Sequence, residues 1–247
     1  MNAFPNRAAD YGRAAFEAIA ETLWPTRCAV CDVPGAVLCE SCKIRLPYLD
    51  WWRACPRCGA PLGRAQCTEC NATVLAPLER KRPPFASCAS SIAFDDAGAR
   101  IVRAYKDQGE RRLAVEMADL MARVIHPAWR AEQPVLVGVP ATARAVRRRG
   151  FDHVELLARE LSAATGMPLA QPLARPRSTD QRGLDRAERA KNMAEAFTAL
   201  PGASVPERVL LIDDVYTTGA TLFAATDALL AAGAHQVRCL TFARVWG

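Results

Sequence analysis

Residues 209–222 read VLLIDDVYTTGATL, and the fold can be argued outward from this stretch. Its opening apolar run suits a strand buried on both faces of a parallel sheet, and we expect the strand to end where Asp213 and Asp214 bring in charge. Small and hydroxylated residues follow at 216–219, and residues 220–230 have the composition of a helix. The order strand, turn, helix predicts an α/β protein.

The turn at residues 216–219 is suited to a phosphate group. Such a turn directs backbone N–H groups and threonine hydroxyls into one concavity at a helix N-terminus, where the positive end of the helix dipole favours an anion. The two carboxylates just upstream can accept hydrogen bonds from the vicinal hydroxyls of an attached sugar. The stretch therefore fits a ribose 5-phosphate, with an ordinary acidic turn between strand and helix as the alternative interpretation.

This stretch closely resembles the phosphoribosyl pyrophosphate (PRPP) motif of type I phosphoribosyltransferases. In that motif the paired acids bind the ribose hydroxyls and the TTG-x-T portion binds the 5-phosphate. The sequence contains no G-x-x-x-x-G-K-[ST] or G-x-G-x-x-G, so nucleotide-binding folds with those motifs lose their main support. The resemblance implies a PRPP site at Asp213, Asp214, Val215, Tyr216, Thr217, Thr218, Gly219, Ala220 and Thr221.

Length and composition predict a globular protein. The chain has 247 residues, of which 51% are hydrophobic, enough for a sizeable core. No run approaches the length of a membrane span, and the N-terminus lacks the apolar segment of a signal peptide, so we expect no membrane insertion and a cytoplasmic location. The net charge of +6 comes from basic residues interspersed with acids, which allows nucleic-acid binding without requiring it.

Eight of the ten cysteines form four C-x-x-C pairs. Two such pairs complete a tetrahedral thiolate site typical of structural zinc, so we expect two zinc ions in a module too small to bury a sufficient core of its own. Neighbouring pairs are expected to share a site, because the gap between the second and third pairs resembles a spacer, but an interleaved pairing is also possible. Tandem pairs do not fit redox chemistry. The expected ligands are Cys28, Cys31, Cys39, Cys42, Cys55, Cys58, Cys67 and Cys70.

The chain is predicted to have four regions: an N-terminal helix within 1–27, a double zinc ribbon at 28–70, a linker at 71–86, and a domain at 87–247 in which strands and helices alternate. Cys88 and Cys239 are expected to be buried strand residues. The alternation predicts a parallel sheet flanked by helices, with ligands beyond the carboxyl ends of its strands. We predict strands at 88–94, 135–139 and 236–244, weaker strands at 169–173 and 195–198, and helices at 98–107, 113–125 and 154–165.

Two further stretches follow predicted strands of this domain. A tight turn at residues 140–142 precedes a cluster of arginines, whose guanidinium groups suit pyrophosphate oxygens. We expect Arg149 to face the site, and Arg144 and Arg147 to lie on a solvated helix face. Residues 175–192 are almost entirely polar, which favours a lid that would shield the site from water.

Five motifs follow one another along the chain: four C-x-x-C pairs, then AYKDQG, RRRGFDHVELLA, DQRGLDRAERAKNMAEAF and LLIDDVYTTGATL. With them the chain, from about residue 28 to its end, resembles the ComF family, a double zinc ribbon joined to a type I phosphoribosyltransferase-like domain. Some members are associated with DNA uptake in natural competence. Where the family commonly has Asn-Gln, this chain has Asp152 and His153, and we expect His153 to be a surface residue at a helix start. Characteristic family positions fall on Lys106, Arg149, Gly150, Phe151, Gln181, Arg189, Asn192 and Phe197.

The resemblance implies an enzyme that transfers the phosphoribosyl group of PRPP, with Mg²⁺, to an acceptor that the sequence does not reveal. Positioning and charge stabilisation would carry catalysis, and no dedicated base is visible. The implied catalytic residues are Asp213, Asp214, Lys106, Arg149 and Arg189. The implied pyrophosphate-binding residues are Pro140, Ala141, Thr142 and Arg149, and those of the flexible lid are Gln181, Arg189 and Asn192.

The alternative hypothesis is a single-stranded DNA binding protein that uses the phosphoribosyltransferase fold as a PRPP sensor or scaffold, with competence or DNA-processing proteins as partners. Trp51 and Trp52, among arginines 53, 57 and 64, combine stacking surfaces with cations. A competing interpretation, which we favour slightly, is that both tryptophans pack the zinc ribbon against the catalytic domain.

Overall fold

The structure is a computed structural model that describes residues 25–175 and 197–246. The chain divides into two compact units, Met1–Arg45 and Leu46–Gly247. The helix predicted within residues 1–27 falls almost entirely outside the described residues. The boundaries predicted at residues 27, 70 and 86 stay a prediction, whereas the packing divides the chain between the second and third cysteine pairs.

The described part of the first unit is a knuckle followed by one short helix, α2 (Glu40–Ile44). An antiparallel bridge joins Arg27 to Pro34, and the backbone N–H of Cys28 donates to the carbonyl of Val33 at 3.0 Å. Of the described residues in this unit, the buried ones are Cys28, Leu38 and Cys42. So few buried side chains cannot stabilise a fold by apolar packing alone.

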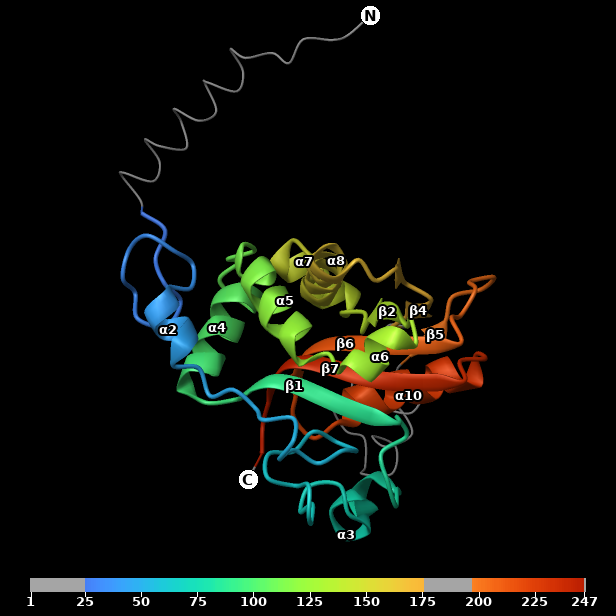
Figure 1. Cartoon of the computed structure of the whole chain (residues 1–247). Helices are drawn as coiled ribbons and strands as arrows, with labels where there is room; N and C mark the ends of the chain where they lie inside the picture. The colour runs from blue at the N-terminus through green and yellow to red at the C-terminus, as the bar shows by residue number, and fades with distance from the viewer. Residues whose placement is uncertain (1–24, 176–196, 247) are drawn as a thin grey trace, which may run out of the picture. The chain divides into compact units, whose positions relative to one another are not determined.

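The second unit is built on a parallel sheet with the strand order β1-β7-β6-β2-β3 (Figure 1). Every neighbouring pair in this sheet is parallel. A separate antiparallel ladder joins two very short strands, β4 and β5. The bounds are β1 Ser87–Ala93, β2 Val135–Gly138, β3 Leu169–Ala170, β4 Leu173–Ala174, β5 Thr198–Ala199, β6 Arg208–Tyr216 and β7 Gln236–Arg244.

Helices cover both faces of this sheet (Figure 1). α5 and α8 pack against each other and against β1, β2, β6 and β7, whereas α10 packs against β6 and β7 from the other face. The predicted fold class, a parallel α/β sheet flanked by helices, is therefore confirmed. The bounds are α3 Ala72–Leu75, η1 Ala76–Leu78, α4 Asp96–Lys106, α5 Leu113–Val124, α6 Pro127–Ala131, α7 Ala143–Arg149, α8 His153–Thr165 and α10 Ala220–Ala231.

The central strand β6 runs further than predicted. Its middle residues, Leu210 to Ile212, are fully buried, as expected for a strand covered on both faces. The strand does not stop at the acid pair, however, because its ladder with β7 continues from Asp213, opposite Thr241, to Tyr216, opposite Arg244. Backbone pairing thus carries the strand past the two charges. The turn begins one residue later than expected, at residue 217.

The segment from Leu46 to the last cysteine pair is packed onto the edge strand β1. The N–H of Leu49 donates to the carbonyl of Ser91 at 3.0 Å, and the N–H of Ala93 donates to the carbonyl of Pro47 at 2.9 Å. Gly59, with φ +72°, approaches this strand so closely that a Cβ there would lie 2.6 Å from the carbonyl oxygen of Cys88. These contacts join the later cysteine pairs to the sheet.

Two smaller differences concern short helices. The predicted linker at 71–86 contains α3 and η1, and the arginine-rich stretch after β2 forms α7. Cys88 and Cys239 are buried strand residues, as predicted. Within the described ranges, no helix has both the length and the apolar character that spanning a membrane would require.

Candidate functional site

A cavity of about 340 Å³, here called the acid-pair cavity, opens at the carboxyl ends of β2 and β6. It brings together stretches that lie far apart in the sequence, among them the end of α4, the turn after β2 and the end of β6. Parallel strands that end side by side place such stretches together. The lining residues are Lys106, Val139, Pro140, Ala141, Thr142, Ala145, Arg149, His153, Val154, Arg175, Asp213, Asp214, Val215, Thr217 and Thr221.

The two aspartates are 7% and 3% exposed, yet both line this cavity. Lys106 donates from Nζ to Oδ2 of Asp214 at 2.7 Å. Burial, together with the charge of Asp214, raises the pKa of Asp213 well above its ordinary value. Burial acts to raise the pKa of Asp214, but Lys106, His153 and a hydrogen bond with Asp213 together hold that pKa below its ordinary value. One carboxylate is therefore firmly ionised, and its neighbour takes up a proton more readily.

The phosphate turn is here residues 216–221, which include the last residue of β6 and the first two residues of α10. Gly219 is the N-cap of α10 with φ +84°, and no side chain caps this helix. The N–H of Phe223 closes the first helical turn onto the carbonyl of Gly219 at 2.8 Å, so the N–H groups ahead of it have no intrahelical acceptor. Thr217 and Thr221 line the cavity, whereas Tyr216, Thr218, Gly219 and Ala220 form the turn without lining it. The N–H of Ala220 donates to Oγ1 of Thr218 at 3.5 Å, and the other N–H groups at this helix start are suited to an anion.

Glycine is required at position 219. A Cβ there would lie 2.8 Å from ring atoms of both Tyr216 and Phe223, closer than real Cβ contacts allow. The positive φ is a second constraint, because side chains with a Cβ rarely adopt it. The turn therefore rests directly on two aromatic rings.

The turn at residues 140–142 is held by Asp152, one of the two positions that depart from the family pattern. One carboxylate oxygen of Asp152 accepts from the N–H of Ala141 at 3.0 Å, while the other caps α8 by accepting from Val154 and Glu155. Thr142 caps α7 by accepting from the N–H of Ala145 at 3.2 Å. A single carboxylate thus ties the turn after β2 to the start of α8.

Arg149 points into the acid-pair cavity, and its side chain is 11% exposed. Its Nη1 lies 3.3 Å from Nδ1 of His153, and its Nη2 lies 3.7 Å from a carboxylate oxygen of Asp107. Its Nε is buried and has no hydrogen-bond partner among the described residues. A buried donor without a partner is costly unless an acceptor arrives, and an anion would supply one. Arg144 and Arg147 are exposed, as expected.

His153 was expected on the surface, and that prediction is wrong. The residue is 5% exposed, and its Nε2 lies 3.6 Å from Oδ2 of Asp214. The sequence placed it correctly at the first position of a helix. That helix, however, begins at the edge of the sheet where the acid pair lies, so the side chain turns inward. Burial is the main reason that the pKa of His153 falls to about 4, with Lys106 and Arg149 adding to the effect and Asp214 opposing it.

This pKa predicts a pH-dependent stability. Between about pH 6.5 and about pH 4 the unfolded chain binds a proton at His153 that the folded chain does not. The free energy of unfolding should therefore fall as pH drops through this window, by up to about 3 kcal/mol. Denaturant unfolding at several pH values measures this, and His153→Gln should remove that part of the pH dependence. An imidazole resonance of His153 that titrates near pH 6.5 in the native protein would contradict it.

Arg175 is a second residue of the cavity that we did not single out from the sequence. Its guanidinium lies over the ring of Phe197, 5.0 Å from the centroid. Burial lowers the pKa of Arg175, and the nearby Asp213 opposes that shift. The predicted lid residues Gln181, Arg189 and Asn192 lie outside the described residues, so their roles stay predictions.

The eight paired cysteines form two groups of four, as the preferred pairing predicted. Within each group all four sulfur atoms lie within 4.8 Å of one another. Three of the Sγ–Sγ distances are 3.6 to 3.7 Å. Four sulfurs placed tetrahedrally about 2.3 Å from one ion would be roughly 3.8 Å apart, so both groups fit zinc. The first cluster is Cys28, Cys31, Cys39 and Cys42, and the second cluster is Cys55, Cys58, Cys67 and Cys70.

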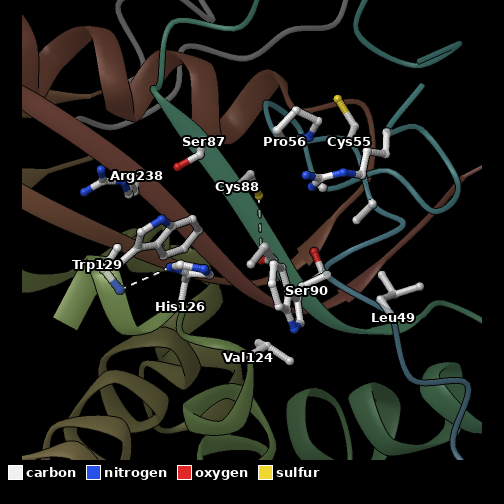
Figure 2. A pocket seen from close by; sticks show the side chains of 16 residues that line it. Leu49, Cys55, Pro56, Ser87, Cys88, Ser90, Val124, His126, Trp129 and Arg238 are labelled. Carbon is white, nitrogen blue, oxygen red and sulfur yellow. Dashed lines mark hydrogen bonds between the residues drawn. The ribbon is translucent and has the colours of Figure 1, made fainter. Parts of the chain in front are cut away.

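A second cavity, the aromatic cavity, has a volume of about 400 Å³ and lies along β1 between the second cluster and α6. Trp51, Trp129 and His126 line it, and the rings of Trp51 and His126 meet edge to face with centroids 5.2 Å apart. Trp51 therefore contacts the catalytic domain, as the packing interpretation expected, but Trp51 and Trp52 remain 56% and 54% exposed, which leaves aromatic surface accessible. Figure 2 shows Trp129, His126 and Arg238 to one side of β1 and Leu49, Cys55 and Pro56 to the other.

Curated proteins with similar sequences are named for DNA utilization and competence. The DNA utilization protein YhgH of Salmonella typhi is 30% identical over 232 residues, covering 84% of this chain and 97% of the relative. The competence protein ComFC of Bacillus subtilis is 27% identical over 213 residues, covering 85% of each. The competence protein F of Haemophilus influenzae is 26% identical over 220 residues, covering 85% and 89%.

Comparisons with family models and with solved structures provide less information about this chain. No family model matches the chain. Among solved structures, the allosteric regulatory enzyme of purine biosynthesis gives a TM-score of 0.36 at 20% identity, covering 52% of this chain and 25% of that one. Glutamine phosphoribosylpyrophosphate amidotransferase from B. subtilis gives a TM-score of 0.37 at 21% identity, with the same coverage. Scores this low support no functional conclusion.

Proposed function

This chain belongs to the ComF family, and from that premise we propose that its acid-pair cavity binds PRPP and transfers the phosphoribosyl group to an acceptor. The observation that carries the proposal is that one cavity is lined by the acid pair, by Thr217 and Thr221 of the phosphate turn and by Arg149. Each of these suits a different part of one ligand. No single stretch of the chain could supply all three.

Each part of PRPP has a matching set of groups. Asp213 and Asp214 would accept hydrogen bonds from the ribose hydroxyls, and N–H groups of the phosphate turn would hold the 5-phosphate. Arg149, with its partnerless Nε, and Lys106 would bind the pyrophosphate and stabilise its charge as it leaves. Mg²⁺, when bound with PRPP, would neutralise pyrophosphate oxygens. Catalysis would come from positioning and charge, without a dedicated base.

Titration calorimetry tests this proposal with PRPP in the presence and absence of Mg²⁺. We expect saturable binding of one PRPP per chain that strengthens with Mg²⁺, and competition by inorganic pyrophosphate. Release of pyrophosphate in the presence of candidate acceptors would then establish turnover. An absence of binding at millimolar PRPP by the zinc-loaded, reduced protein would overturn the proposal.

A second function, single-stranded nucleic-acid binding, is supported by the aromatic cavity and the exposed tryptophans beside it. Aromatic faces stack bases regardless of sequence, and Arg64, which lines the cavity and is exposed, would meet a phosphate. The relatives' names point to DNA as well. In this proposal competence or DNA-processing proteins are partners, and the PRPP site acts as a sensor. Cytoplasmic location stays a prediction from the sequence.

Replacing Trp51 and Trp52 with alanine should weaken binding of a fluorescent single-stranded oligonucleotide by about 30-fold or more, because each of the two stacked bases contributes about 1–3 kcal/mol. Fluorescence anisotropy at several salt concentrations measures the affinity and the contribution of phosphate contacts. Trp246→Ala is the matched control, because Trp246 is 49% exposed and does not line the aromatic cavity. Equal losses in both variants, or no loss in either, would refute this role.

A further inference from the structure

Arg244, at the end of β7, is a buried charge in an unusual position. The residue is 2% exposed. Within the described part of the chain, no carboxylate lies within ion-pair distance of its guanidinium. An unpaired buried cation is strongly unfavourable, so the protein must supply a negative partner of another kind.

The partner is the second cluster. Nη1 of Arg244 donates to the backbone carbonyl of Cys58 at 2.8 Å, and Nη2 lies 3.6 Å from the sulfur of Cys58. Its Nε has no partner among the described residues. Four thiolates that hold one divalent ion exceed its charge by two, so the metal-loaded cluster is an anion beside the guanidinium. Loss of the ion would remove the centre that holds the Cys58 sulfur beside the guanidinium.

The other side of Arg244 faces the phosphate turn. Its guanidinium lies over the ring of Tyr216, 3.9 Å from the centroid. Tyr216 pairs with Arg244 across the ladder between β6 and β7, and its carbonyl accepts from the N–H of Val245 at 2.9 Å. The same phenol ring supports Gly219, where a Cβ would lie 2.8 Å from it. A continuous line of contacts therefore runs from Cys58 through Arg244 and Tyr216 to Gly219.

This line connects residues far apart in the sequence, and each link is specific. The negative charge of the cluster stabilises the guanidinium of Arg244 in its buried position. The guanidinium in turn stabilises the position of the Tyr216 ring through a cation–π contact. The phosphate turn in turn needs the ring, because it rests on Tyr216 and Phe223. In a packed interior, a shift at one link is passed to the next.

We propose that Arg244 is a positioning residue through which metal in the second cluster sets the geometry of the phosphate turn, so that PRPP binds tightly only when this cluster is loaded. The PRPP part rests on the function proposed above. The coupling between cluster and turn does not. The line of contacts contains no residue of the first cluster, which belongs to the other compact unit.

Two variants test this coupling, each with a control. Arg244→Met removes the link, and Cys67→Ser removes a ligand of the second cluster that does not contact Arg244 in the structure. Arg244→Lys is the first control, because it keeps the positive charge but loses the planar guanidinium with its paired N–H donors. Cys39→Ser is the second control, because it removes a ligand of the first cluster instead. Hydrogen exchange of the amides at 217–221 reports on the turn without any ligand, and calorimetry with PRPP reports on binding. Metal content is measured for every variant.

We expect Arg244→Met and Cys67→Ser to speed exchange at residues 217–221 and to weaken PRPP binding by about tenfold or more, because small displacements of binding groups are costly. Arg244→Lys should fall between them and the unmodified protein, and Cys39→Ser should leave both readouts unchanged. If Cys67→Ser fails to fold, Arg244→Met alone decides the question. Unchanged exchange in Arg244→Met that keeps its metal would overturn the coupling, whereas changed exchange in a protein that never binds PRPP would overturn only the PRPP function.

Discussion

The double variant Asp213→Asn and Asp214→Asn should lose PRPP binding by about 100-fold or more. Both carboxyl groups line the acid-pair cavity, and hydrogen bonds to a charged acceptor contribute about 1.5–3 kcal/mol each. Amides of the same size keep the shape of the site but lose this charge. Titration calorimetry with PRPP and Mg²⁺, run beside the unmodified protein, measures the loss.

The fold should survive this change at a modest cost. Lys106 loses its ion-pair partner Asp214, but its side chain is 26% exposed and can turn to water. Asp119→Asn, on the exposed face of α5, is the matched control and should bind PRPP normally. Thermal unfolding of each variant separates loss of binding from loss of structure. An unchanged affinity in the double variant would remove the acid pair from the site.

Metal analysis of freshly reduced protein should return about two zinc ions per chain, one for each group of four sulfurs. Removing them with a strong chelator should unfold the first cluster outright. Among its described residues only three are buried, and two of these are ligands. Metal binding by such small modules contributes on the order of 10 kcal/mol to folding. Hydrogen exchange across residues 25–45, before and after chelation, follows the loss.

The two remaining cysteines provide the control for this experiment. Cys88 and Cys239 are buried strand residues outside both clusters, so Cys88→Ala and Cys239→Ala should leave the zinc content unchanged. A zinc content near zero in reduced protein would contradict the assignment of both clusters. A content near one would show that only one cluster is a metal site.

The second cluster should respond differently to chelation. It is packed onto β1 through Gly59 and through the backbone bonds of Pro47 and Leu49, so the sheet supports part of its structure. We therefore expect exchange to increase in residues 55–70 and in the phosphate turn, while α5 and α8 stay protected. This contrast between the clusters follows from packing, because their cysteine spacings are alike.

The sequence alone determined the features that depend on local order. The C-x-x-C spacing predicted both clusters and their pairing, because two sulfurs on one short knuckle can meet one ion. The apolar run from residue 209 predicted the central strand, and the Thr-Thr-Gly turn predicted the helix start at residue 220. Buried strands and helix entrances have short-range signals, so they can be read without knowing what packs against them.

Only the tertiary structure decided which distant side chains meet. His153 turns inward because α8 begins beside the end of β6, and Arg175 reaches the same cavity from another segment. Arg244 contacts Cys58 of the second cluster, 186 positions earlier in the sequence, and it also contacts Tyr216. Burial and charge pairing depend on neighbours that the fold brings together, and no local pattern in the sequence carries that information.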